Sequence, residues 1–403
     1  MGCRQHVPVW HEATREWVKQ GRLVLLGVTQ EQHADRCRLF AQWKRFDWPI
    51  LHDPINLLEA PAVPIVVAID KHGIVRAIRP RPETLAAEFL DKTFDDDAPP
   101  GAPRATGPPD AASLLREATA SSDAGAWRAV GDALTIWGGA ERLDQAIDAY
   151  GRAVALDPTD KNALFRLGVA HRMRYESAGR RPGDFQAAVD AWGRALEVDP
   201  NQYIWRRRIE QYGPRLAKPY SFYDWVAQAN EEISRSGEVP IPLIVEPYGS
   251  ELAGPARDVL AEAVVPLEPD PKGLVHRDEG RLIEAEVVIV PARVHPGQAA
   301  RVHVTFRPNA AHTGHWNNES TPLRVWVAPA EGWTIATRLL EAPQRNQPES
   351  DEIRRLDFEV KAPLIAAGKT RLAAYALYNT CEQAGGRCLF LRQDLTIELD
   401  VAK

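Results

Sequence analysis

The first candidate for chemistry is a cysteine near the amino terminus. Cys3 begins a stretch with helical character, and Pro8 lies five positions after it. The amino end of a helix carries partial positive charge and unpaired N–H groups, which favour a thiolate and lower the pKa of a cysteine. We therefore expect Cys3 to be a candidate redox residue. The alternative is a chemically idle cysteine close to a chain end.

A second pair of cysteines frames a turn near the carboxyl end of the chain. Cys381 and Cys388 flank a segment that contains Ala384-Gly385-Gly386 and lies between two stretches typical of strands. A tight turn there can bring the two Cα atoms within the ~4.4–6.8 Å that a disulfide requires. The pair is either a redox centre or a disulfide that staples a hairpin, and both alternatives stay open.

Three further residues are weaker candidates. Cys37 lies on the apolar side of an expected helix, where we expect a small core residue. His312 and His315 have a spacing that suits two metal ligands, but no third ligand is evident, so we expect a solvated loop. No metal or organic cofactor is expected.

Composition limits the classes of function. A chain of 403 residues is too long for one ordinary core, so two or three domains are expected. The net charge is −6 and no basic block is present, which argues against nucleic-acid binding. No apolar run approaches the ~20 residues that span a bilayer, and the first residues do not form a signal peptide.

Residues 1–94 are expected to alternate between helix and strand. Helices are expected over 11–20, 30–46 and 83–92, and strands over 22–28, 63–69 and 74–78. A turn over 70–73 joins the last two strands as a hairpin. Residues 95–110, rich in Asp, Pro and Gly, are expected to form a linker.

The stretch around Pro64 suggests a family. Val63-Pro64 opens one of these strands, and Asp70 and Gly73 follow at its end. With Cys3 and Pro8, this pattern resembles the redoxin branch (AhpC/TSA type) of the thioredoxin superfamily. The resemblance implies a cis peptide bond before Pro64. It also places that proline beside the redox cysteines, where it pairs with the substrate backbone.

The same resemblance implies a strand and a cysteine directly before Met1. In the family, two redox cysteines two residues apart begin the first long helix, and Cys3 matches the second of them. The preceding strand lies in the middle of the family's sheet, and without it each buried unpaired backbone group costs ~1–3 kcal/mol. We expect a domain that is incomplete at its amino end, with a true start upstream and a cysteine or selenocysteine codon before Met1.

Residues 111–236 are expected to form a helical module with an internal repeat. Ala146, Tyr150, Ala153 and Pro158 recur 42 positions later as Ala188, Trp192, Ala195 and Pro200. Gly131 and Gly168 lie upstream of the two copies. The pattern resembles the tetratricopeptide repeat (TPR), a unit of ~34 residues with two helices, lengthened here by a loop over 177–183. The resemblance implies a surface that binds a protein partner.

Residues 240–403 have a pattern of period two. Strands are expected over 300–306, 323–327, 356–360, 372–377 and 395–401. Many short strands of this kind indicate an antiparallel β-sandwich. Because Cys381 and Cys388 flank an Ala-Gly segment near its end, the region resembles the amino-terminal domain of the thiol:disulfide interchange protein DsbD. The resemblance implies that the sandwich is immunoglobulin-like and that these cysteines are a redox pair.

The sequence therefore predicts a multidomain α/β + α + β protein with a truncated thioredoxin-like domain, a TPR-type module and a β-sandwich. We expect a thiol–disulfide oxidoreductase. The alternatives are a peroxiredoxin-like peroxide reductase and a non-catalytic TPR scaffold. Expected partners are protein thiols and disulfides, and a protein bound to the TPR module. The compartment stays open, because an upstream start could add a signal peptide.

Overall fold

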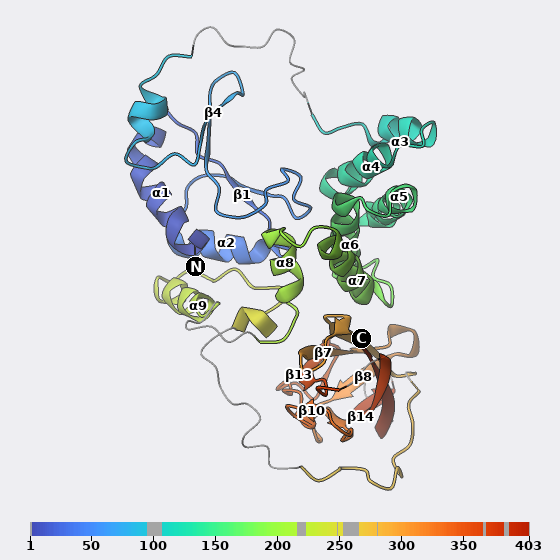
Figure 1. Ribbon diagram of the computed structural model, residues 1–403. Helices are drawn as coiled ribbons and strands as arrows, with labels where there is room; N and C mark the ends of the chain where they lie inside the picture. Colours follow the sequence, from blue (N-terminus) through green and yellow to red (C-terminus); the bar gives the residue numbers. More distant parts are fainter. Residues whose placement is uncertain are drawn as a thin grey trace. The chain divides into compact units, whose positions relative to one another are not determined.

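The computed structural model combines helices and sheets, with a helical segment and a carboxyl-terminal β-sheet domain (Figure 1). It describes residues 2–94, 107–215, 223–247, 249–252, 266–279, 281–365, 368–382 and 387–402. Two compact units divide the chain: Met1–Arg181, Arg194–Arg208 and Ser221–Pro247 form the first, and Pro182–Gly193, Ile209–Tyr220 and Tyr248–Lys403 form the second. None of the described helices has both the length and the apolar character needed to cross a bilayer.

The amino-terminal segment of the first unit contains short strands between helices. Its elements are α1 (Gly2–Lys19), β1 (Gly27–Thr29), α2 (Ala34–Lys44), β2 (Ile50–His52), β3 (Val67–Ile69), β4 (Val75–Ile78) and a π-helical turn (Ala86–Leu90). Gly21 ends the first helix with a φ of 69°, as predicted. The strands form two separate sheets, β1 parallel to β2 and β3 antiparallel to β4. They are shorter than predicted, and the last helix is a single π-helical turn.

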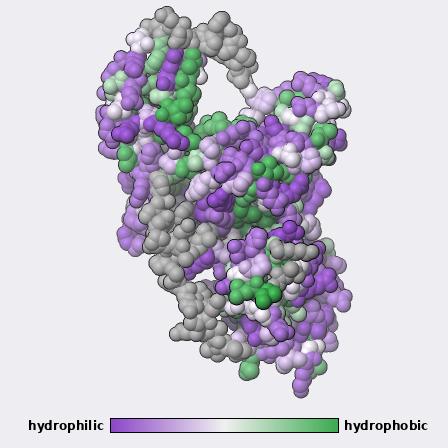
Figure 2. Space-filling model, in the orientation of Figure 1, coloured by the Kyte–Doolittle hydropathy of each residue, from purple (hydrophilic) through white to green (hydrophobic). Residues whose placement is uncertain are grey.

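Apolar side chains on these strands are exposed to an unusual degree. The exposed fractions are 44% for Val28, 51% for Ile69 and 71% for Ile78. Figure 2 shows apolar atoms gathered over the hairpin of β3 and β4. Strands of an α/β sheet are normally buried on both faces, so this segment has apolar strands that the described residues do not cover.

The helical segment of the chain runs from α3 to α9. These helices are α3 (Ala111–Thr119), α4 (Ala124–Trp137), α5 (Leu143–Leu156), α6 (Lys161–Tyr175), α7 (Asp184–Val198), α8 (Tyr203–Glu210) and α9 (Trp225–Arg235). Asp123 and Asp160 begin α4 and α6, where their carboxylates accept hydrogen bonds from backbone N–H groups of the first turn. Such caps satisfy N–H groups that a helix cannot pair internally.

The repeated residues occupy the same positions in α5 and α7. Ala146, Tyr150 and Ala153 in α5, and Ala188, Trp192 and Ala195 in α7, are all 0% exposed. The two prolines of the repeat follow directly after these helices, and residues 177–183 connect α6 to α7 without a helix or strand. The residues that repeat in the sequence are therefore residues that are buried in both copies.

Buried polar side chains join the amino-terminal segment to the helices of the first unit. Arg208 in α8 donates to the backbone carbonyl of Pro54 at 3.1 Å, and Arg166 in α6 donates to that of Ile55 at 3.3 Å. His33 lies 3.3 Å from the carboxylate of Glu176. Burial alone would raise the pKa of Glu176, but the Arg172 charge and the His33 hydrogen bond outweigh it and hold the pKa at about 2.

The second unit contains two sheets that share one core. The strands are β5 (Ile283–Val290), β6 (Arg293–Val294), β7 (Ala299–Pro308), β8 (Gly314–Asn317), β9 (Arg324–Val327), β10 (Thr334–Ile335), β11 (Leu339–Glu341), β12 (Glu349–Ser350), β13 (Arg354–Lys361), β14 (Gly368–Glu382) and β15 (Cys388–Val401). One sheet has the order β10-β13-β7-β5, and the other β11-β9-β14-β15-β6, with β8 attached to β14 and β12 attached to β8. Val302 and Phe358 from the first sheet lie in one buried cluster with Trp316 and Ile397 from the second.

We predict that Gly131→Ala destabilises the first unit by ~1–3 kcal/mol, the usual range for an overpacked core. A Cβ atom at Gly131 would lie 2.5 Å from the ring of Tyr150. This ring is fully buried, and its hydroxyl donates to Asp132 at 2.9 Å, so it cannot move away easily. Urea unfolding followed by circular dichroism measures the effect.

The matched control is Gly151→Ala in the neighbouring helix α5, where no heavy atom lies within 4 Å of the new Cβ. There alanine should stabilise the protein by about 0.5–1 kcal/mol, because glycine is a poor helix former. Equal effects of the two substitutions would contradict the close approach of α4 and α5.

We predict that Glu176→Gln lowers the stability of the first unit at neutral pH. The pKa of Glu176 is lowered from 4.5 to about 2, so its contribution is complete above pH 4.5 and is lost as the pH falls toward 2. A shift of this size corresponds to about 3 kcal/mol at most. Urea unfolding at several pH values should show the difference between wild type and variant shrinking across this window.

The control substitution is Glu12→Gln, at a side chain that is 75% exposed. It should change the stability by less than about 0.5 kcal/mol at every pH, as is usual for surface positions. A constant difference between wild type and Glu176→Gln from pH 6 to pH 2 would contradict the proposed role of the carboxylate charge.

Candidate redox site

Backbone pairing of β14 with β15 positions the two carboxyl-terminal cysteines. The pairing runs from Gly368 opposite Val401 to Cys381 opposite Cys388. The N–H of Glu382 donates to the carbonyl of Arg387 at 3.0 Å. The next pair along an antiparallel ladder is then of the non-hydrogen-bonded kind, in which the side chains approach most closely.

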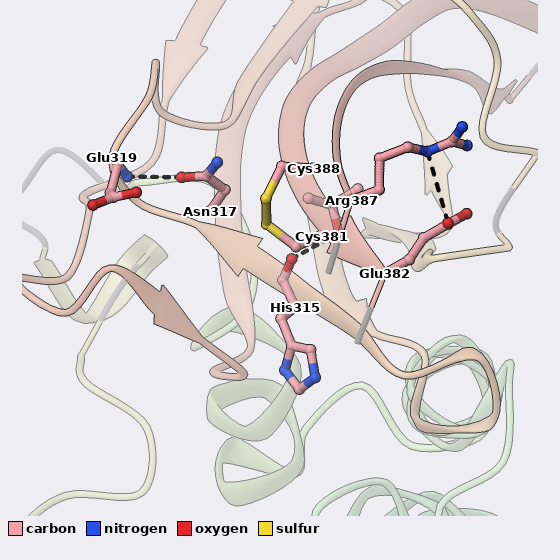
Figure 3. The surroundings of a disulfide bond; sticks show 8 residues. His315, Asn317, Glu319, Cys381, Glu382, Arg387 and Cys388 are labelled. Atoms are coloured by element: carbon pink, nitrogen blue, oxygen red, sulfur yellow. Dashed lines mark hydrogen bonds and ion pairs between the residues drawn. A yellow bond between two sulfur atoms is a disulfide. The ribbon is translucent and has the colours of Figure 1, made fainter. Parts of the chain in front are cut away.

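Cys381 and Cys388 form a disulfide, as predicted (Figure 3). The two sulfur atoms are 2.03 Å apart, and the two Cα atoms are 3.9 Å apart, which is shorter than the predicted ~4.4–6.8 Å. Residues Gly385 and Gly386, which were predicted to make the turn, lie outside the described part of the chain. The disulfide is thus a link between directly opposite residues of two neighbouring strands.

The two cysteines differ in their exposure to solvent. Cys381 is 0% exposed, whereas Cys388 is exposed. At this end of the sheet β14 lies between β15 and β8, with Cys381 opposite His315 of β8. On its other side β15 pairs with β6 at Asp400 and Val401, and Arg392 of β15 forms an isolated parallel bridge with Arg277. At Cys388 itself, the described strands pair with β15 on the β14 side alone, and the residue as a whole is exposed.

Polar contacts hold the strands around the disulfide. The hydroxyl of Thr380 donates to the backbone carbonyl of His315 at 2.7 Å. The ring of His315 bonds to the carboxylate of Asp351. Glu382 forms ion pairs with Arg281 and, at 3.9 Å, with Arg387 (Figure 3). The backbone pairing and the Thr380 hydrogen bond hold the end of β14 independently of the disulfide, whereas the ion pairs of Glu382 involve exposed arginines and contribute little.

The disulfide closes only a short loop, because the two cysteines are seven positions apart. In the chain-entropy model a loop of this size is worth about 2.5 kcal/mol. The long pairing of β14 with β15 already holds the two strands together. The geometry therefore allows the bond to open without loss of the hairpin.

Glu349 belongs to the same site, and sequence analysis missed it. A carboxylate oxygen of Glu349 and the sulfur atoms of both cysteines all lie within 4.8 Å of one another. Glu349 comes from β12, which pairs with β8, which in turn pairs with β14. The segment around Glu349 lacks a run of alternating residues, so no signal in the sequence connects it with the cysteines.

Cys3 lies in the first turn of α1, as predicted, but its pKa is not lowered. The residue as a whole is exposed, yet desolvation of the sulfur raises the pKa and outweighs the lowering effect of a backbone hydrogen bond. The predicted lowering by the helix terminus is therefore wrong. Cys37 in α2 is half-buried, and desolvation raises its pKa against the effect of a hydrogen bond with Thr29.

The peptide bond between Val63 and Pro64 is cis, as predicted. A second cis bond, between Val290 and Pro291, was not predicted. The structure gives no hydrogen bond between the described residues Pro64 and Cys3, and their juxtaposition stays a prediction. In the second unit, His312 is exposed, and neither it nor His315 belongs to the described group of side chains close enough to hold a metal ion.

Comparisons with known proteins add no family. No protein-family model and no curated protein matches the chain. Among solved structures, MamA is 21% identical over 31% of this chain and 57% of its own, with a TM-score of 0.20. The PapD-like domain 7 of human CEP192 is 13% identical over 35% of this chain and 96% of its own, with a TM-score of 0.17. This chain thus spans little more than half of MamA, and TM-scores this low carry no argument.

We predict that replacing both Cys381 and Cys388 by alanine leaves the β-sheet domain folded. The free energy of unfolding should fall by no more than about 2.5 kcal/mol, the entropic worth of the short loop. Urea unfolding measures this loss, and wild type reduced with dithiothreitol is the control that should show a similar one. Loss of the native circular dichroism spectrum in the alanine variant would instead show that the domain needs the disulfide in order to fold.

Proposed function

We propose that this protein is a thiol–disulfide oxidoreductase that works through Cys381 and Cys388. The observation that carries the proposal is the disulfide between one exposed and one buried cysteine on neighbouring strands. An exposed sulfur can be attacked by a thiolate of another protein, whereas a buried one is reached only by its neighbour. This division of roles is what an exchange reaction through a mixed disulfide requires.

The reaction is a transfer of two electrons between thiol pairs. A thiolate of a partner protein attacks the sulfur of Cys388, a mixed disulfide forms, and Cys381 leaves as a thiolate. A second thiolate of the partner then attacks its own sulfur in the mixed disulfide and releases Cys388. The partner ends with a disulfide, and Cys381 and Cys388 end as two thiols after proton uptake. In the reverse direction, Cys388 attacks a substrate disulfide and Cys381 resolves the intermediate.

For the fold of this site, we propose an immunoglobulin-like sandwich that resembles the DsbD amino-terminal domain. The two sheets with a shared core and the placement of the cysteines near the end of the domain support this proposal. For the helical segment we propose TPR-type repeats that bind a protein partner. The equivalent buried positions in α5 and α7 support it.

For residues 1–94 we propose a thioredoxin-like segment of the redoxin type, with Cys3 and Pro64 at its site. The position of Cys3 in the first turn of α1 and the cis bond before Pro64 support this proposal. A peroxide-reducing activity, the alternative for this segment, would need a cysteine with a lowered pKa, whereas the pKa of Cys3 is raised by desolvation.

We predict that Cys381→Ser and Cys388→Ser differ in their ability to trap a substrate. Both variants are made in a Cys3→Ser, Cys37→Ser background and incubated with insulin as a disulfide substrate. Cys381→Ser keeps the exposed thiol and lacks the resolving one, so it should accumulate mixed disulfides. Cys388→Ser keeps only the buried thiol and should form far fewer. Non-reducing gels and mass spectrometry count the adducts.

The quadruple variant without any cysteine is the control and should form no adduct. If the Cys381→Ser variant traps no more insulin than this control, the disulfide is structural. The chain would then act as a non-catalytic scaffold through its helices. Equal trapping by both single variants would contradict the separate roles given to the exposed and the buried cysteine.

A further inference from the structure

Three side chains that can carry negative charge meet at the end of the β14–β15 hairpin. The carboxylate of Glu349 and the sulfur atoms of Cys381 and Cys388 lie within 4.8 Å of one another. Glu349 is half-buried, Cys381 is buried and Cys388 is exposed. Within the described residues, no other group of cysteine, histidine and carboxylate side chains is gathered this closely for a metal ion.

Reduction changes what this group can bind. In the disulfide, the sulfur atoms carry no charge and have no ligand role. After reduction there are two thiols beside a carboxylate, and ionisation of both thiols would place three negative charges within 4.8 Å. Like charges this close oppose ionisation. A divalent cation removes the repulsion, because it binds all three groups at once and takes the place of the thiol protons.

We propose that the reduced pair, Cys381 and Cys388, together with Glu349, binds a thiophilic divalent cation of the zinc class. Two thiolates and a carboxylate are ligands that Zn²⁺ accepts in proteins, and a water molecule completes a four-coordinate site. Binding joins the metal to two sulfur atoms and one oxygen atom and releases two thiol protons. The disulfide must first take up two electrons and two protons from a dithiol reductant.

A tetrahedral ion fits this group once the disulfide has opened. The two sulfur atoms, 2.03 Å apart in the disulfide, must then separate to the ~3.8 Å between two thiolate ligands of zinc. The carboxylate oxygen of Glu349 already lies within 4.8 Å of both. Cys388 lies on the exposed side and gives the ion a way in. His315 is engaged with Asp351, and the site does not need it.

Whether this site binds a metal ion depends on the redox state of Cys381 and Cys388. The oxidised protein holds its two sulfur atoms in a covalent bond and presents only Glu349 to an ion. The reduced protein presents all three ligands, and the bound ion protects both thiolates from an incoming disulfide. The proposal requires the reduced pair alone and does not rest on the exchange activity proposed above.

The test uses the full chain in a Cys3→Ser, Cys37→Ser background, so that only the two ligand cysteines remain. The protein is reduced with a dithiol, freed of reductant without oxygen, and titrated with Co²⁺ as the probe. We expect one equivalent to bind, with a thiolate-to-cobalt charge-transfer band that Zn²⁺ then abolishes. The oxidised protein should show no such band. Absence of the band from the reduced protein, or its presence in the oxidised protein, would overturn the proposal.

The role of Glu349 is tested by Glu349→Gln, with Glu382→Gln as the matched control on β14. Glu349→Gln should weaken Co²⁺ binding at least about tenfold, since even partners outside the ligand shell contribute this much. Glu382→Gln should leave the affinity within about twofold, because its carboxylate is outside the group. Both variants must re-form the Cys381–Cys388 disulfide, which shows that they are folded. Equal affinities for the two variants would overturn the assignment of Glu349.

The trapping experiment with insulin is carried out in the presence of a chelator, so its result is independent of metal. A protein that traps insulin but binds no Co²⁺ refutes only the metal site. A protein that binds Co²⁺ through both cysteines but traps nothing refutes only the exchange activity.

Discussion

The register of β14 against β15 is the constraint on which the candidate site depends. Side chains alternate between the two faces of a strand, so a slip of one residue would turn a cysteine to the wrong face. Packing in the core prevents this slip. Tyr378 and Trp316 are fully buried and meet edge to face at 5.9 Å, and the hydroxyl of Tyr378 donates to Asp278 at 2.7 Å. The buried face of β14 thereby sets the position of Cys381, three residues further along the strand.

The order of strands in the sheet explains why the two cysteines are not equivalent. A residue on an inner strand is paired by strands on both sides, whereas a residue on an edge is paired by a strand on one side. Cys381 lies on an inner part of the sheet and Cys388 on its edge, although the chain between them is short. The same sheet brings Glu349 to the cysteines through β12 and β8. The order of strands in this sheet thus brings together the exposed Cys388, the buried Cys381 and the carboxylate of Glu349.

Those features of the structure that depend on residues close together in the chain could be predicted from the sequence. Alternating residues predicted β7, β9 and β13 within two residues at each end, and parts of the longer strands β14 and β15. The cis bond before Pro64 and the Cys381–Cys388 disulfide were also predicted. Glu349 was missed because it reaches the site through two strand pairings rather than through any local pattern. The pKa of Cys3 was predicted in the wrong direction, because desolvation depends on atoms from distant residues.

The two units differ in how well the charge and burial of their cysteines suit redox chemistry. A reactive pair needs one accessible sulfur and a second sulfur within bonding distance, and Cys381 and Cys388 meet both conditions within one domain. In the first unit, Cys3 and Cys37 are free thiols whose pKa values are raised by desolvation, which reduces the fraction of reactive thiolate at neutral pH. The exchange proposed for the carboxyl-terminal hairpin therefore needs no help from Cys3, whereas Cys3 would need a second sulfur and a lower pKa. The redox chemistry proposed for this chain consequently rests on one β-sheet, and the role proposed for the helices is to bind a partner.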